Sequence, residues 1–165
     1  MPDHDNPLRA ALQARDPAMI ERALAADVIV HSPILDLPFE GREEATKLFS
    51  VIYEVLGEVS YLFDVPGDPH VFGWRSDVRG EPLEGVDLFS RNERGEVDEI
   101  TVMMRPFRGI AAFLDASGPL SAKRLGGSPL AVRVATPPTS AAMRLTARFA
   151  PRALGMRRAR GSSSG

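Results

Sequence analysis

One carboxylate in this chain stands out as a group that could do chemistry. Apolar residues alternate along Gly85–Arg91, and Asp87 falls on the same face of the predicted strand as the aromatic ring of Phe89. A carboxyl group held among apolar side chains is either paired or has a raised pKa. With a raised pKa, Asp87 is a candidate acid or base near neutral pH; the alternative is a structural role, bonded to an Arg or Tyr inside the protein.

His31 is the candidate partner of this acid, because an imidazole also titrates near neutral pH. It stands at the end of a predicted strand, directly before Ser32 and Pro33. Strand alternation places His31 on the opposite face from Ser32, unless the turn at Pro33 twists it inward. The alternative is a strand-end histidine with no chemical role.

Large apolar and aromatic side chains on the neighbouring predicted elements could form the walls of a ligand site. Phe72 and Trp74 share one face of a strand, where they are either pocket wall or plain core. Tyr53 lies one helical turn from Phe49, so its hydroxyl either enters the cavity or covers the helix surface. The predicted wall residues are Phe72, Trp74, Phe89, Met104 and Tyr53.

A β-hairpin is the predicted scaffold of the site. Two alternating stretches are joined by residues 92–95, in which Gly95 can take the positive φ of a tight loop. Helices are expected over 7–14, 17–25 and 42–56, and a brief strand over 27–30. Four antiparallel strands are expected over 58–65, 71–79, 83–91 and 97–105. Helices followed by a meander predict an α+β fold whose sheet wraps around the long helix.

Composition narrows the function classes. A chain of 165 residues with 44% hydrophobic content is one ordinary soluble domain. It has no cysteine, no signal-peptide pattern at its N-terminus and no apolar run long enough to span a membrane, so we expect a cytoplasmic protein. Glycine-rich phosphate loops, zinc-helix motifs and clusters of metal-ligating histidines are also missing, and we expect neither cofactor nor metal.

Charge divides the chain into two parts. Residues 1–110 carry 11 Lys and Arg against 21 Asp and Glu, a net charge of −10, whereas residues 111–165 carry 9 against 1, a net charge of +8. We therefore expect a domain over 1–115 and a basic extension over 116–165, rich in Pro, Gly and Arg and disordered from 157 onward. Residues 141–154 form a possible amphipathic helix, either solvated or docked on an acidic face, an anionic membrane or a partner. The acidic domain itself is not expected to bind nucleic acid.

Three segments together resemble a known family. They are ADVIVHSP at 26–33, EGR at 40–42 and GVDLFSRNERGEVDEITVMMRP at 85–106. Their order is similar to that in the SnoaL-like branch of the nuclear transport factor 2-like superfamily, which includes ketosteroid isomerases and polyketide cyclases. The resemblance covers about residues 7–115. It implies a cone, in which a strongly curved sheet is closed by helices around a deep apolar pocket.

The resemblance also implies residue roles. In ketosteroid isomerases, the strand before the hairpin carries a protonated Asp that donates a hydrogen bond to the substrate oxyanion, and Asp87 falls at that position. Their general base is an Asp directly before a Pro at the end of the first strand, where this chain has Ser32 before Pro33. Their oxyanion-hole tyrosine aligns near Leu8. Because two of the three groups are missing, steroid isomerisation by that mechanism is not expected.

These observations predict a pocket protein for a small apolar, oxygen-bearing ligand. The enzymatic interpretation is proton transfer of isomerase, cyclase or epoxide hydrolase type, with Asp87 as acid or base and His31 as its partner. The alternative is a non-catalytic carrier or a dimerising module on the same fold. A homodimer is expected through the outer sheet face, where Leu88 and Met103 are apolar.

Overall fold

The structure of the protein is a computed structural model that describes residues 6–156. Its helices are α1 (Pro7–Ala14), α2 (Pro17–Ala23), α3 (Arg42–Val55), α4 (Phe107–Arg124) and α5 (Pro129–Ala153). Its strands are β1 (Leu24–His31), β2 (Phe39–Glu40), β3 (Ser60–Val65), β4 (His70–Val78), β5 (Glu81–Arg91) and β6 (Val97–Arg105). No described helix is both long and apolar enough to cross a membrane.

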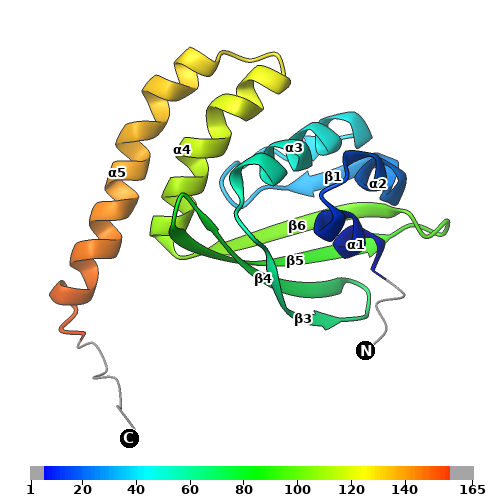
Figure 1. Ribbon diagram of the computed structural model, residues 1–165, viewed down its shortest axis with the longest axis horizontal. Coiled ribbons are helices and arrows are strands. Elements are labelled where there is room, and N and C mark those ends of the chain that lie inside the picture. Colours follow the sequence, from blue (N-terminus) through cyan, green and yellow to red (C-terminus); the bar gives the residue numbers. More distant parts are fainter. Residues whose placement is uncertain (1–5, 157–165) are drawn as a thin grey trace, which may run out of the picture.

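The strands form one curved sheet in the order β2-β1-β6-β5-β4-β3 (Figure 1). All neighbouring strands are antiparallel except β1 and β6, which run parallel. Helices α1 to α4 pack with the inner face of the sheet, and their apolar side chains join those of the strands in a single core. This arrangement confirms the α+β prediction and leaves the inner face of the sheet as the place for a pocket.

Two Asx-Pro pairs start the first helices as expected. The side chain of Asn6 accepts a hydrogen bond from the backbone N–H of Arg9 at 2.8 Å, and Asp16 accepts one from Ala18 at 2.9 Å. Proline follows each cap at the first helical position, where its missing N–H costs nothing. These caps fix where α1 and α2 begin, and so fix the position of α1, which contributes Leu12 to the pocket described below.

The β5–β6 hairpin has the predicted register and loop. Gly95 adopts a φ of 78°, and the strands pair so that Asp87 faces Val102 and Phe89 faces Ile100. Inward positions therefore alternate with outward ones along both strands. The first strand is longer than the predicted 27–30, because β1 pairs in parallel with β6, a contact between distant segments that local periodicity does not reveal.

The C-terminal part differs most from expectation. Residues 107–124 form one helix, so the expected boundary between residues 115 and 116 falls inside α4, where Phe113, Ala116 and Ser117 are buried. Helix α5 follows and is far longer than the predicted 141–154, although Pro137, Pro138 and Pro151 lie within it. Packing along α4 holds this helix despite the lost backbone hydrogen bonds. The disorder predicted for 157–165 lies outside the described residues.

Candidate functional site

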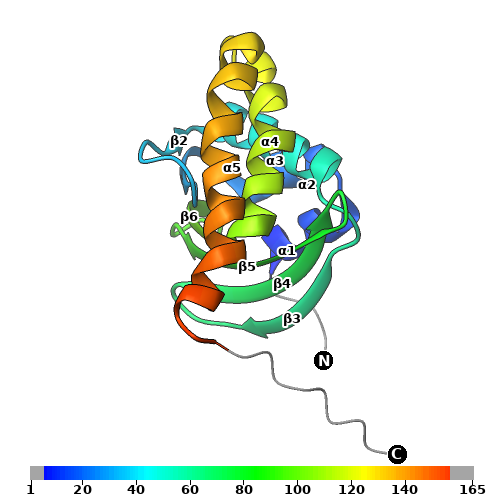
Figure 2. The same ribbon diagram turned by 90° about the vertical axis from the view of Figure 1, so that its left-hand side faces the viewer.

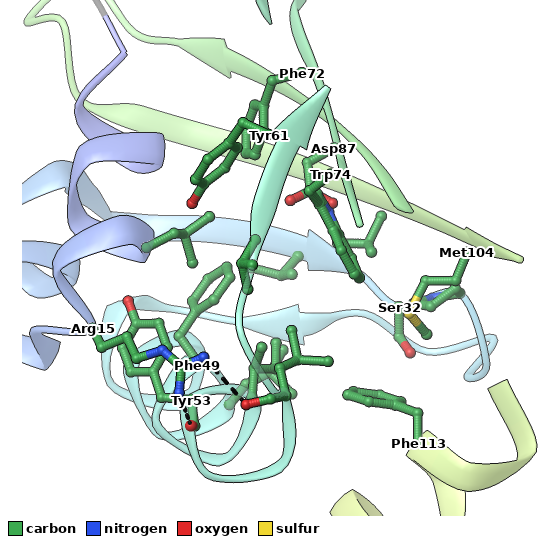
Figure 3. Close-up of a pocket in the computed structure, with 18 residues that line it drawn as sticks. Arg15, Ser32, Phe49, Tyr53, Tyr61, Phe72, Trp74, Asp87, Met104 and Phe113 are labelled. Atoms are coloured by element: carbon green, nitrogen blue, oxygen red, sulfur yellow. Dashed lines mark hydrogen bonds between the residues drawn. The ribbon is translucent and has the colours of Figure 1, made fainter. Parts of the chain in front are cut away.

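A pocket lies between the inner face of the sheet and helices α1, α3 and α4 (Figure 3). Its free volume is about 80 Å³. Most of its wall is apolar and includes Leu48, Phe49, Ile52, Phe72, Val102 and Phe113. The lining side chains that carry polar atoms are Arg15, Ser32, Tyr53, Tyr61, Trp74 and Asp87.

Asp87 is the buried acid of this pocket. The residue is 6% exposed, and its Oδ1 atom has no hydrogen-bond partner. Loss of solvent raises the pKa of this carboxyl group from 3.8 to about 7, and a hydrogen bond from Trp74 offsets part of that rise. A carboxyl group with this pKa is present in both protonation states near neutral pH.

Trp74 reaches Asp87 because residue 85 is a glycine. Trp74 on β4 pairs with Gly85 on β5, and a Cβ atom on Gly85 would overlap the indole ring of Trp74. The indole ring lies over Gly85 and donates a hydrogen bond to the carboxyl group of Asp87, two residues further along β5. The sequence analysis did not single out Gly85; a glycine inside a strand is the signal that could have found it.

The hydroxyl group of Tyr53 is directed to the backbone. It donates to the carbonyl oxygen of Ala11 at 3.2 Å, and burial, followed by the nearby Tyr61 and Asp16, raises its pKa. Tyr53 thus lines the pocket as predicted, but its hydroxyl joins α3 to α1.

Arg15 closes the same end of the pocket. Its guanidinium group donates to the carbonyl oxygens of Tyr53 and Leu56, each at 3.2 Å, and to that of Gly57. Arg15 is exposed, so its side chain lies between the pocket and solvent. We call these three bonds the Arg15 bridge.

The structure does not bring His31 to Asp87. The His31 side chain is 44% exposed, and its Nε2 atom lies 3.1 Å from Oε1 of Glu99 on the outer face of the sheet. Alternation along β1 instead turns Ser32 toward the pocket. Its hydroxyl oxygen accepts hydrogen bonds from the backbone of Ile34 and Leu35 at 3.2 and 3.4 Å, so it supports the turn after β1.

The other predicted wall residues divide into two groups. Phe72, Trp74 and Met104 line the pocket, together with Tyr53. Phe89 is buried outside that lining, with its ring stacked at 4.7 Å on His70. Leu8, the position aligned with the isomerase tyrosine, is fully buried in the core and is also absent from the lining.

A second polar cluster ties α1 to the far edge of the sheet. Asp64 pairs with Arg9 at 2.7 Å, accepts a hydrogen bond from Asn6 at 3.3 Å and contacts Nε2 of the buried His70. Burial acts to raise the Asp64 pKa, but the hydrogen bonds from Arg9, His70 and Asn6 outweigh it and leave the pKa lowered. Within residues 6–156, no three His, Asp or Glu side chains are grouped as metal ligands.

Comparison with known proteins gives a fold. No family model and no curated protein sequence matches the chain. A structure from Silicibacter pomeroyi, described as an uncharacterized protein with a cystatin-like fold, matches with a TM-score of 0.65 at 25% identity over 68% of this chain and 80% of that one. A steroid delta-isomerase from Pseudomonas aeruginosa gives 0.62 at 21% identity, covering 72% and 85%. A putative polyketide cyclase from Sinorhizobium meliloti gives 0.52 at 17%, covering 62% and 95%.

This chain has the nuclear transport factor 2-like fold. The resemblance inferred from the hairpin and the first strand is thereby confirmed at the level of fold. Because these structures share only 17–25% of their sequence with this chain, they establish its fold and not its activity.

The chemistry of this nuclear transport factor 2-like pocket therefore depends on its own side chains. Among the described lining residues, Asp87 is the only carboxyl group, and none is a histidine. A mechanism that divides the work between two carboxylates, or between an Asp and a His, is not assembled there. As a single carboxyl group, Asp87 can still donate a hydrogen bond or a proton to a bound molecule.

Proposed function

We propose that this protein binds a small, largely apolar molecule with one oxygen acceptor, and that protonated Asp87 donates a hydrogen bond to that oxygen. The observation that carries the proposal is the unpartnered Oδ1 atom of Asp87 in an apolar pocket. A buried polar atom without a partner is costly, and a ligand oxygen would supply the missing partner. Inside an apolar wall, this one bond would also orient the ligand.

The same group supports proton-transfer catalysis. A carboxyl group with a pKa of about 7 can give a proton to a carbonyl or epoxide oxygen in one step and accept a proton in another. A steroid delta-isomerase and a putative polyketide cyclase share the fold, which supports this class of reaction. A non-catalytic carrier is the second candidate, favoured by the lack of another carboxyl or imidazole group among the described lining residues.

Size limits the ligand. Binding sites for drug-sized molecules typically occupy about 300–1,000 Å³. The free volume of about 80 Å³ is much smaller, so the pocket in this conformation suits a single small ring rather than a fused ring system. A larger ligand would have to displace one of the walls.

A matched pair of probes tests the hydrogen bond. Cyclohexanone and methylenecyclohexane have similar shapes, but only the ketone offers an oxygen acceptor. Calorimetry and the fluorescence of Trp74, the sole tryptophan, should show the ketone binding roughly three- to ten-fold more tightly, the contribution of one neutral hydrogen bond. This preference should fall as the pH rises through about 7, because the ionised carboxylate cannot donate.

Variants at the same residue separate binding from catalysis. Asp87→Leu, which keeps the branched shape of the side chain but cannot donate, should lose or reverse the preference for the ketone, because the ketone oxygen then has no donor. Equal binding by the native protein would contradict the proposal. Hydrogen–deuterium exchange beside the ketone carbonyl, followed by NMR, then distinguishes the two candidates. Exchange that depends on Asp87 indicates proton transfer, and tight ketone binding without exchange indicates a carrier.

A further inference from the structure

Helix α5 has one face packed on α4 and one face packed on nothing that the structure describes. It runs beside α4 at one edge of the molecule, with α4 between it and the other helices (Figures 1 and 2). The packed face includes Val132, Ser140, Met143 and Arg144 at helical spacing. A Cβ atom on Gly118 would lie 2.9 Å from Cγ1 of Val132, Ser140 is buried, and Arg144 pairs with Asp115 of α4 at 2.7 Å.

The opposite face carries a row of large apolar side chains, which we call the apolar stripe: Leu130, Val134, Leu145 and Phe149. Their spacing of four, eleven and four residues places them on one side of a helix. These four side chains are between 53% and 71% exposed. A helix that faces only water normally carries polar residues at such positions, so the apolar stripe indicates a surface that binds something.

The charges on α5 are all of one sign. The helix carries Arg133, Arg144, Arg148 and Arg152 and no Asp or Glu. Arg148 and Arg152 fall on the same side as the apolar stripe by helical spacing, and the Arg148 guanidinium lies 5.6 Å from the ring of Phe149. Arginine side chains of this kind can lie along apolar groups while their charged ends reach an anion.

The apolar stripe and the arginines together argue against a second copy or a nucleic acid as the partner of α5. A second copy docked stripe to stripe would bring two sets of arginines together without a carboxylate on either helix, which is unfavourable. A nucleic acid would pair with the arginines but leave the apolar stripe in water. An anionic bilayer surface satisfies both features, because its interior accepts the apolar side chains and its phosphates accept the arginines.

We propose that α5 docks the protein on an anionic lipid bilayer, with the apolar stripe inserted at the interface and the arginines against lipid phosphates. Because α4 separates α5 from the rest of the protein, the acidic part of the chain stays away from the membrane. The repulsion between this acidic part and the anionic lipids is then screened by salt, because the Debye length is about 8 Å at physiological ionic strength.

Vesicle flotation with the full chain tests this proposal. The protein should float with vesicles that contain phosphatidylglycerol, bind vesicles of phosphatidylcholine alone much more weakly, and be released by salt. Leu145→Glu should weaken binding at least roughly ten-fold, because it removes an apolar side chain that would be buried in the bilayer and adds a negative charge.

Thr139→Glu is the matched control, since Thr139 is exposed on α5, lies off the apolar stripe and receives the same charge. It should weaken binding by no more than roughly five-fold, the equivalent of about 1 kcal/mol for one charge near the surface. Thermal unfolding followed by circular dichroism should be similar in both variants.

Three results would overturn the proposal. They are failure to float with phosphatidylglycerol vesicles, equal losses in the two variants, and a concentration-dependent self-association that Leu145→Glu abolishes. The last would assign the apolar stripe to contact between copies.

Discussion

At the scale of single residues, the pocket is defined by a carboxyl group that is expensive to ionise. Asp87 has an apolar surrounding, one donor in Trp74 and one oxygen atom without a partner. The energy that makes it a useful acid is taken from the stability of the fold, because the charged form is disfavoured only in the folded state. Site and stability are therefore linked through the same proton.

Asp87→Asn should change how stability depends on pH. The folded pKa of about 7 lies above the ordinary value of 3.8, so the contribution of Asp87 to stability is fully present below about pH 3.8 and is lost as the pH rises through 7. Three pH units correspond to roughly 4 kcal/mol, an upper limit for the loss. The neutral Asn variant should lack this loss, so its stability relative to the native protein should rise between about pH 4 and 7 and stay constant above, as measured by urea unfolding across the pH range. Parallel curves for both proteins would contradict the raised pKa.

Gly85→Ala should disturb Asp87 through Trp74. The added methyl group overlaps the indole ring, and loss of its hydrogen bond should raise the Asp87 pKa further, since that bond lowers it. The pH titration of Trp74 fluorescence and of the Asp87 carboxyl carbon by NMR would both shift to higher pH. Gly73→Ala is the control, because its methyl group overlaps Phe63 instead of Trp74. It should reduce stability but leave the titration unchanged.

At the scale of elements, the features set by local sequence patterns could be predicted, and those set by contacts between distant segments could not. The hairpin and the inward placement of Asp87 follow from alternation within a few residues, and the first helix follows from its cap and proline. The pairing of β1 with β6 and the contact of Trp74 with Gly85 depend on segments far apart in sequence. Helix α5 was underestimated because its prolines outweigh helical periodicity until α4 is present to pack against it.

Asp64→Asn should loosen α1 at neutral pH. The substitution removes a charged acceptor shared by Arg9, Asn6 and His70, at a cost of about 1.5–3 kcal/mol. Because the folded pKa of Asp64 is lowered, its contribution is present above the unfolded pKa, about 3.8, and is lost as the pH falls through the folded value. Urea unfolding should therefore show a gap between native and variant at pH 7 that closes in acid. A gap independent of pH would assign the loss to shape rather than charge.

At the scale of the whole molecule, the outer face of the sheet remains the expected contact between copies. Met103 of β6 is 56% exposed there, and Ile29 of β1 and Phe63 of the edge strand β3 are also exposed. An uncovered sheet face with apolar side chains is a common dimer surface. This surface belongs to the sheet, whereas the apolar stripe belongs to α5, so the two can be tested independently.

Met103→Lys should convert a homodimer to a monomer. A lysine on each side of a symmetric contact would place like charges together and remove apolar area, so the dissociation constant of the dimer should rise at least roughly ten-fold. Analytical ultracentrifugation at micromolar concentration measures it. Leu154→Lys, at an exposed position after α5, should leave the mass unchanged. A native protein that sediments as a monomer would remove the dimer hypothesis.

The Arg15 bridge also has a consequence for kinetics. It joins the end of α1 to the end of α3 and separates the pocket from solvent with an exposed side chain. A ligand can enter at this end only after the Arg15 bridge opens, and a bound ligand can leave only after the same opening. The observed association rate would then level off at high ligand concentration, at the rate at which the Arg15 bridge opens. The residence time of a bound ligand would depend on the lifetime of the bridge more than on the contacts with the pocket walls.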